Sequence, residues 1–291
     1  MNKIVFIIIS ALLFASCEKF IDMEIPDEGR KITVNSFIND QQNPTVYLSQ
    51  SRFILDGDYS FPLITDAHVT LYKGETQVTT FNHVGDGIYM ADYVCEKGNS
   101  YTLKVSRGNE EVSSTTHIPE SVPFQLIDTA TIISQDMYQS TPYLRFRIKI
   151  EDPVQDVNYY MISFKNKEYP ISFYTRESYV ENGTDRFLNY AIFSDKLING
   201  QSRVLTLDIE TYNFMEEVNP LEIYVNAISK DMYLYYIQLN KYYEAQGGFL
   251  AEPVMVYSNI QNGLGIFGGY TISKMQMNIP QLVDPIIEGK K

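Results

Sequence analysis

Three glycines near the C-terminus have the spacing of a nucleotide-binding loop. Gly263, Gly265 and Gly268 follow the pattern G-x-G-x-x-G, in which a glycine-rich turn and a helix N-terminus hold a pyrophosphate. Residues 270–279 alternate like a strand, however, and only 23 residues follow Gly268, too few to complete a βαβ unit. We therefore predict no cofactor and interpret the glycines as a turn or bulge between two late strands, where they permit positive φ and close backbone approach.

Residues suited to hydrolysis or metal binding are sparse and scattered. None of the three histidines pairs with another at metal-ligand spacing, and the sequence has no serine-hydrolase, zinc-protease or P-loop motif. Carboxylates occur as adjacent pairs, but adjacent residues of a strand point to opposite faces of its sheet. Three such pairs in the body of the chain are Glu110–Glu111, Glu151–Asp152 and Glu216–Glu217. We predict no catalytic and no metal-binding residue. A hydrolase whose carboxylates converge from distant segments is the less favoured alternative.

The composition narrows the classes of function further. The chain has 291 residues and a net charge of −13, so its surface repels phosphate backbones, and we predict no nucleic-acid partner. With 44% hydrophobic residues the chain can bury a core, and its 23 tyrosines favour strands. Its two cysteines are Cys17, at a predicted processing site, and Cys95, which leaves no disulfide framework.

The first 29 residues have the pattern of a sorting signal followed by a tether. The apolar run 4–15 is shorter than the roughly 20 residues that span a bilayer, and it fits the apolar region of a signal peptide. The residues just before Cys17 resemble the lipobox of bacterial lipoproteins, although Phe14 stands where leucine is usual. We predict a lipoprotein signal peptide over 1–16, lipidation of Cys17, and an acidic tether over 17–29. The alternative is an ordinary cleaved secretory signal.

The rest of the chain reads as strands separated by turns. About seven short segments between residues 30 and 119 are rich in Val, Ile, Thr and Tyr and predict an immunoglobulin-like β-sandwich. After a linker with two prolines, a second β domain is predicted over 124–280, followed by a tail over 281–291. Residues 142–150 alternate apolar with basic and polar side chains, as in a half-buried strand. The predicted fold is mainly β, with two immunoglobulin-like sandwich regions and one Tyr-rich helix in the second.

That helix is predicted over residues 231–246. Ser229 or Asp231 can cap its start, and a pair of glycines can end it. Tyr233 and Tyr242 are the candidate binding surface, because tyrosines bind partners or ligands by area and stacking. The favoured interpretation is that most of the apolar positions form one stripe packed on the sheet. That stripe consists of Met232, Tyr235, Tyr236, Leu239 and Tyr243.

Several longer segments resemble one family, the Bacteroidota lipoproteins of domain-of-unknown-function 4249. The resemblance rests on Cys17 with its leader and on the Tyr-rich helix after NAISKDMY (226–233). It also rests on DPVQDVNYYMI (152–162), FSDKLINGQ (193–201) and EPVMVYSNIQNGLGIFGG (252–269). It implies an outer-membrane lipoprotein of β-sandwich build, on either the periplasmic face or the cell surface. Because such genes often accompany TonB-dependent transporters, it also implies an accessory role in uptake, and it implies no catalytic residues.

Two expectations about function follow. The first is a lipid-anchored binding or accessory protein that helps a TonB-dependent transporter capture a nutrient whose identity the sequence leaves open. The alternative is a structural or adhesive envelope lipoprotein without a small-molecule ligand. In addition, Asp128-Thr129-Ala130 resembles the O-glycosylation site used in the Bacteroidota, so Thr129 is a candidate for glycosylation.

Overall fold

The computed structural model describes most of the chain between Asp27 and Ile279. The described residues are 27, 29–53, 55–57, 60–135, 140–154, 157–167, 169–181, 187–196, 199–214, 220–246 and 254–279. Cys17, the predicted signal peptide and the tail 281–291 lie outside them, as does almost all of the predicted tether, so lipidation of Cys17 stays a prediction. Among the helices of the described part, none is long and apolar enough to cross a membrane.

The described residues form strands β1 to β18 and two helices, which confirms the prediction of a mainly β chain. The strands are β1 (Ile32–Asn39), β2 (Thr45–Gln50), β3 (His68–Lys73), β4 (Thr76–Gly85), β5 (Ile88–Met90), β6 (Asn99–Arg107), β7 (Glu110–Ile118), β8 (Phe124–Gln135), β9 (Ser140–Glu151), β10 (Tyr159–Asn166), β11 (Tyr169–Ile171), β12 (Phe173–Tyr174), β13 (Phe187–Leu188), β14 (Ala191–Ser194), β15 (Ser202–Glu210), β16 (Leu221–Ile228), β17 (Leu264–Thr271) and β18 (Lys274–Met277). The helices are the 3₁₀ turn η1 (Thr211–Phe214) and α2 (Lys230–Ala245), which starts and ends within one residue of the predicted helix.

One large sheet of 13 strands runs through both predicted β regions. Its path is β11-β10-β16-β17-β1-β2-β5-β4-β3-β6-β7, with β14 beside β10 and β18 beside β16. β17 runs parallel to β1, with Gly265 opposite Val34 and Tyr270 opposite Asn39, so a late strand joins the first one. The prediction of two separate immunoglobulin-like sandwiches is therefore not confirmed. Local alternation identifies strands but does not identify which distant strands pair.

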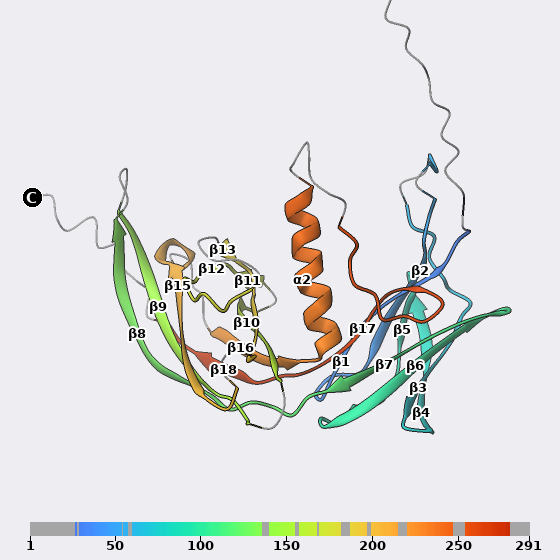
Figure 1. Ribbon diagram of the computed structural model, residues 1–291, viewed down its shortest axis with the longest axis horizontal. Helices are drawn as coiled ribbons and strands as arrows, with labels where there is room; N and C mark the ends of the chain where they lie inside the picture. The colour runs from blue at the N-terminus through green and yellow to red at the C-terminus, as the bar shows by residue number, and fades with distance from the viewer. Residues whose placement is uncertain are drawn as a thin grey trace, which may run out of the picture.

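The strands of the first region curl round a core of their own (Figure 1). β7 packs against β17, and Ser113 of β7 forms an isolated antiparallel bridge with Gln261, just before β17 begins. The two ends of this strand series thus approach each other. Inside lie fully buried side chains such as Ile38, Leu48 and Tyr101, together with Phe267 of β17. The first region therefore depends on the C-terminal strand to complete its core.

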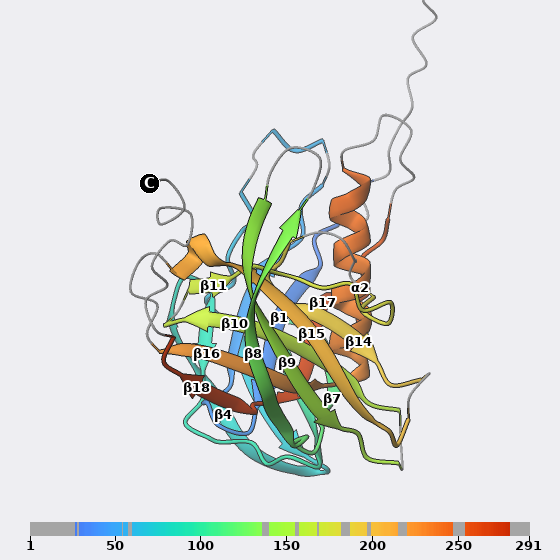
Figure 2. The same ribbon diagram turned by 90° about the vertical axis from the view of Figure 1, so that its left-hand side faces the viewer.

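A five-stranded sheet, ordered β13-β12-β15-β9-β8, lies over β10 and β16, as Figure 2 shows from the side. β9 confirms the alternation predicted for residues 142–150. Its buried residues are Leu144, Phe146, Ile148 and Ile150. On the outer face, Arg145 pairs with Asp208 at 2.7 Å and Arg147 with Asp128 at 2.8 Å. The apolar faces of the two sheets enclose the second core, which lies beside the first.

Gly265 and Gly268 lie within strand β17, and Gly263 lies in the bend just before it, after a turn at Asn262. Residues 254–260 form no strand, so the predicted turn is present but does not connect two late strands. Close backbone approach is confirmed: a Cβ on Gly265, whose φ is +107°, would lie 2.0 Å from the carbonyl oxygen of Val34. A Cβ on Gly269 would lie 2.4 Å from the carbonyl oxygen of His117. The glycines therefore allow β17 to pass closely between β1 and β7.

Candidate functional site

Helix α2 rises from the middle of the molecule, between its two β-rich ends (Figure 1). Its first turn is fixed to β17 through Ser229, the N-cap residue. The Ser229 hydroxyl accepts hydrogen bonds from the backbone N–H of Met232 and of Gly269, both at 3.2 Å. The Ser229 N–H donates in turn to the Gly269 carbonyl at 2.7 Å. One small side chain thus satisfies a free amide of the helix and fixes the helix to the sheet.

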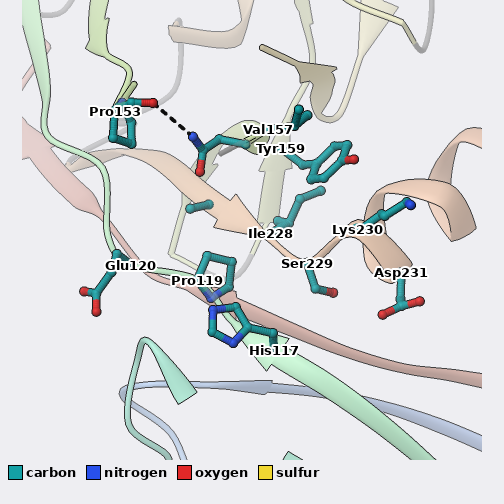
Figure 3. Close-up of a pocket in the computed structure, with 12 residues that line it drawn as sticks. His117, Pro119, Glu120, Pro153, Val157, Tyr159, Ile228, Ser229, Lys230 and Asp231 are labelled. Carbon is teal, nitrogen blue, oxygen red and sulfur yellow. Dashed lines mark hydrogen bonds between the residues drawn. The ribbon is translucent and has the colours of Figure 1, made fainter. Parts of the chain in front are cut away.

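A cavity of about 530 Å³ opens beside this first turn, where the two β regions meet (Figure 3). It is lined by the end of β7 and the linker after it, by the start of β10, and by the junction of β16 with α2. The lining residues are His117, Pro119, Glu120, Pro153, Val157, Asn158, Tyr159, Ala227, Ile228, Ser229, Lys230 and Asp231. Its volume is in the range of small-molecule sites in proteins.

The polar groups around the cavity carry both signs of charge. Lys230 and Asp231 come from the helix, whereas His117 and Glu120 come from the opposite wall (Figure 3). His117 Nδ1 lies 3.2 Å from the Ser100 hydroxyl. Apolar side chains and the ring of Tyr159 complete the wall. A concave site that combines apolar surface with a few polar groups is suited to orienting a small polar ligand.

Asp231 also connects the helix to the segment that precedes β17. It accepts a hydrogen bond from the Tyr257 hydroxyl at 2.6 Å. Burial, followed by this hydrogen bond to a carboxylate, raises the pKa of Tyr257 to about 12. The phenol therefore stays protonated at neutral pH and keeps donating. A carboxylate in the first helical turn also interacts favourably with the helix dipole.

Two aspartates hold the polar loop that forms one wall of the cavity. Asp152 accepts from the Gly200 N–H at 2.6 Å and from the Tyr160 hydroxyl. Asp195 accepts from the Asn158 side chain at 3.3 Å, and its own N–H donates to the Asn158 carbonyl at 3.0 Å. Asn158 donates as well to the carbonyl of Pro153 at 3.4 Å (Figure 3). Residues 152–153 and 158–160 thus belong to one hydrogen-bonded unit with Asp195 and Gly200.

Asp152 and Asp195 are distant in sequence and lie together, as the hydrolase alternative requires of its carboxyl groups. The burial of Asp195 and the position of both groups away from the cavity favour a structural role. Asp195 is completely buried, and neither aspartate lines the cavity. Among the described residues, no group of three or more His, Cys, Asp or Glu could hold a metal ion. The sequence analysis did not identify Asp195 as a site residue. The sequence feature that pointed to it was the resemblance of the segment FSDKLINGQ (193–201) to the family.

The two tyrosines predicted as a binding surface have different environments. Tyr233 is only 6% exposed, its hydroxyl donates to Glu181, and its ring lies 4.6 Å from that of Tyr159. Burial, and then the Glu181 carboxylate, raise the pKa of Tyr233. This part of the prediction is wrong, because the side chain of Tyr233 turns towards the sheet. Tyr242, in contrast, is 38% exposed near the end of the helix.

The residues of the predicted apolar stripe differ in burial along the helix. Met232 is buried, and Tyr235 and Tyr236 contact Phe37 with ring centroids 6.1 and 5.8 Å apart, as the stripe predicts. Tyr243, however, is 62% exposed, and its ring lies 5.7 Å from that of Tyr242. The stripe therefore holds for the first turns of α2 and fails at the last one, where an aromatic pair faces solvent.

Thr129 lies in β8, opposite Phe146 of β9, and its side chain is exposed. The carboxylate of the preceding residue, Asp128, is 2.8 Å from Arg147. β8 is an edge strand of the five-stranded sheet, so a modification at Thr129 would not displace a packed neighbour. Glycosylation of Thr129 stays a prediction.

The fold and site together define a class: a mainly β protein with two packed sheets and one helix anchored beside a cavity at their junction. The chain belongs to the family described as domain of unknown function DUF4249, whose model matches residues 18–276. No curated protein matches it. Among solved structures, it is similar to a DUF3823 family protein from Parabacteroides merdae, with 12% identity over 70% of this chain and 92% of that one. The TM-score of that match is 0.22, too low to support an argument about the fold.

Proposed function

We propose that this protein is a lipid-anchored, non-enzymatic binding or accessory protein of the outer membrane that helps a TonB-dependent transporter take up a nutrient. The observation that supports it best is the cavity beside α2, because its mixed polar and apolar lining suits reversible binding of a small polar molecule. The N-terminal segment that ends at Cys17 supports the anchor. The face of the membrane on which the protein sits follows from neither observation.

The exposed end of α2 supplies the proposed contact with the transporter. Tyr242 and Tyr243 present two adjacent rings, which give large contact area at low conformational cost. Ligand binding at the first turn and partner binding at the last turn would then use one rigid helix. In this arrangement the lipid on Cys17 keeps the protein near the transporter and raises the local concentration of the partners.

A pull-down from solubilised membranes tests the proposal, with wild type compared against the double variant Tyr242→Ala, Tyr243→Ala. We expect wild type to recover a transporter and the double variant to lose most of it. Tyr169→Ala is the matched control, because Tyr169 is 76% exposed on β11, away from the helix. Recovery of abundant unrelated porins alone would count against the proposal. Metabolic labelling with a fatty acid, lost in Cys17→Ser, checks the anchor separately.

One observation favours the structural or adhesive alternative. β8 is twelve residues long, lies at the edge of the five-stranded sheet, and exposes large apolar side chains at Ile127 and Ile133. An exposed edge strand can pair with a strand of another molecule. Under this alternative, a Thr131→Pro substitution on the edge would abolish adhesion or assembly, and growth would not depend on the carbon source.

A further inference from the structure

Asp195 is a fully buried carboxyl group beside a second carboxyl group, that of Asp152. Asp195 lies within hydrogen-bonding range of the Asp152 side chain. Its side chain is 0% exposed, and among the described residues its Oδ1 has no hydrogen-bond partner, although Oδ2 accepts from Asn158. A buried carboxylate oxygen that has no partner and lies beside another carboxylate is unfavourable unless a proton or a cation intervenes.

The surrounding groups indicate a proton. Asn158, Tyr159 and Tyr160 interact electrostatically with Asp195, and none of these three side chains carries a positive charge. Glu181 lies beyond Tyr159, and Lys196, the next residue in the chain, is exposed. Ca²⁺ takes about six to eight oxygen ligands, far more than two carboxyl groups supply. A single proton, by contrast, converts the open Oδ1 into a donor with no further ligand.

We propose that Asp152 and Asp195 share one proton, carried on Asp195 Oδ1 and donated to Asp152, and that this proton fixes Asn158 and the adjoining wall of the cavity. Loss of the proton leaves two facing carboxylates, which repel each other. Asn158 and Pro153, joined by their hydrogen bond, then lose a fixed support. The pair makes the shape of the cavity depend on pH. This inference does not depend on the uptake role.

The direction of the pH dependence follows from burial. Burial raises the pKa of Asp195, hydrogen bonds from Asn158 lower it, and the Asp152 carboxylate raises it again, with a net upward shift. A carboxyl group whose pKa is higher in the folded state contributes stability at low pH, and this contribution is lost as the pH rises through the folded-state value. The wild-type protein should therefore lose stability from this pair as the solution becomes more alkaline.

Infrared spectroscopy of the full mature chain in detergent, with Asp195→Asn as the isosteric variant, tests the proposal. The chain has 36 Asp and Glu side chains, each of which gives a C=O band once protonated, so the readout is the difference between wild type and Asp195→Asn. We expect wild type to retain a C=O band at pH values where exposed carboxyl groups have ionised, and to lose it at higher pH, whereas Asp195→Asn should lack this retained band. At low pH, Asp195→Asn should have the same Tm as wild type. As the pH rises, the Tm of the variant should fall less than that of wild type, because the variant has no proton to lose at this position. Asp92→Asn, at an exposed position, is the control and should behave as wild type.

Amide hydrogen exchange in β10, corrected for intrinsic rates, should accelerate with pH in wild type and not in Asp195→Asn. Two results would overturn the proposal. One is a wild-type spectrum in which no C=O band persists above the pH at which exposed carboxyl groups ionise, a measurement that holds even if the variant fails to fold. The other is a rise in Tm on adding Ca²⁺ to wild type that Asp195→Asn does not show, because the pair would then hold a cation.

Discussion

The first turn of α2 is built into the sheet, whereas its last turn stands in solvent. At the first turn, Ser229 caps the helix on Gly269, and Tyr233 is buried with its hydroxyl on Glu181. At the last turn, Tyr242 and Tyr243 are exposed and contact each other. Both ends are rich in tyrosine, so residue type alone does not separate the structural end from the end that can meet a partner.

This difference shows how one helix can serve two purposes. Its buried end holds the helix in place beside the cavity, because it is hydrogen-bonded to β17 and lines the cavity wall. Its exposed end can change without disturbing a core. Substitutions at the first turn should therefore lower the free energy of unfolding, and substitutions at the last turn should alter binding alone.

The largest expected effect is at Tyr233. Tyr233→Ala removes a buried ring that packs on Tyr159 and leaves Glu181 with one donor fewer. Loss of a large aromatic side chain from a core costs about 3–5 kcal/mol. Chemical denaturation monitored by circular dichroism measures this loss, and Tyr233→Phe, which keeps the ring, should lose about 1 kcal/mol. Equal losses in the two variants would mean that the hydroxyl, not the packing, holds the first turn.

The second-largest loss of stability is expected at Gly269, where the helix is attached to β17. In Gly269→Ala the new methyl group would lie 2.4 Å from the carbonyl oxygen of His117, which is backbone and cannot rotate away. Overpacking of this kind costs about 1–3 kcal/mol. Gly57→Ala is the matched control, because no atom lies within 4 Å of its added Cβ. A Tm for Gly269→Ala equal to that of this control would show that β7 and β17 are not in firm contact.

The sequence predicts the parts of this architecture that are encoded locally. The strand pattern of 142–150 and the helix over 231–246 are predicted from periodicity and capping, and the structure confirms the strand and places α2 within one residue of the predicted helix at each end. Of the two N-caps that the sequence offers, Ser229 and Asp231, the structure selects Ser229. The parallel pairing of β1 with β17 joins residues more than 200 positions apart, and no local pattern specifies such a partner. The prediction of two separate sandwiches is not confirmed for this reason.

The site is harder to predict than the fold. The cavity is lined by residues from the end of β7, the start of β10 and the start of α2, which meet only after the sheets have packed. Asp195 stands in a segment that reads as an ordinary turn after a strand, and its importance comes from burial beside Asp152. Tyr233 and Tyr242 have the same residue type and differ in exposure, which depends on the face of the sheet that the helix covers.

A smaller effect is expected at the cap itself. Ser229→Ala removes the acceptor for two backbone amides, those of Met232 and Gly269. Loss of an N-cap side chain costs about 1–2 kcal/mol, and here a strand amide also loses its partner. Thermal unfolding measures the change, and Ser229→Asp, which restores an acceptor, should recover part of it. A Tm for Ser229→Ala equal to that of wild type would show that packing alone holds the helix on the sheet.

The smallest effect on stability is expected at Tyr242. Tyr242→Ala removes a partly exposed ring whose nearest aromatic neighbour, Tyr243, is itself exposed, so the free energy of unfolding should change by about 0.5 kcal/mol or less. The same variant should weaken capture of the proposed transporter, because the ring supplies contact area to a partner and little to the core. A fall in Tm comparable to that of Tyr233→Ala would show that the last turn is part of the packed structure. The two ends of α2 would then no longer be distinct, and the proposed contact would have to lie elsewhere.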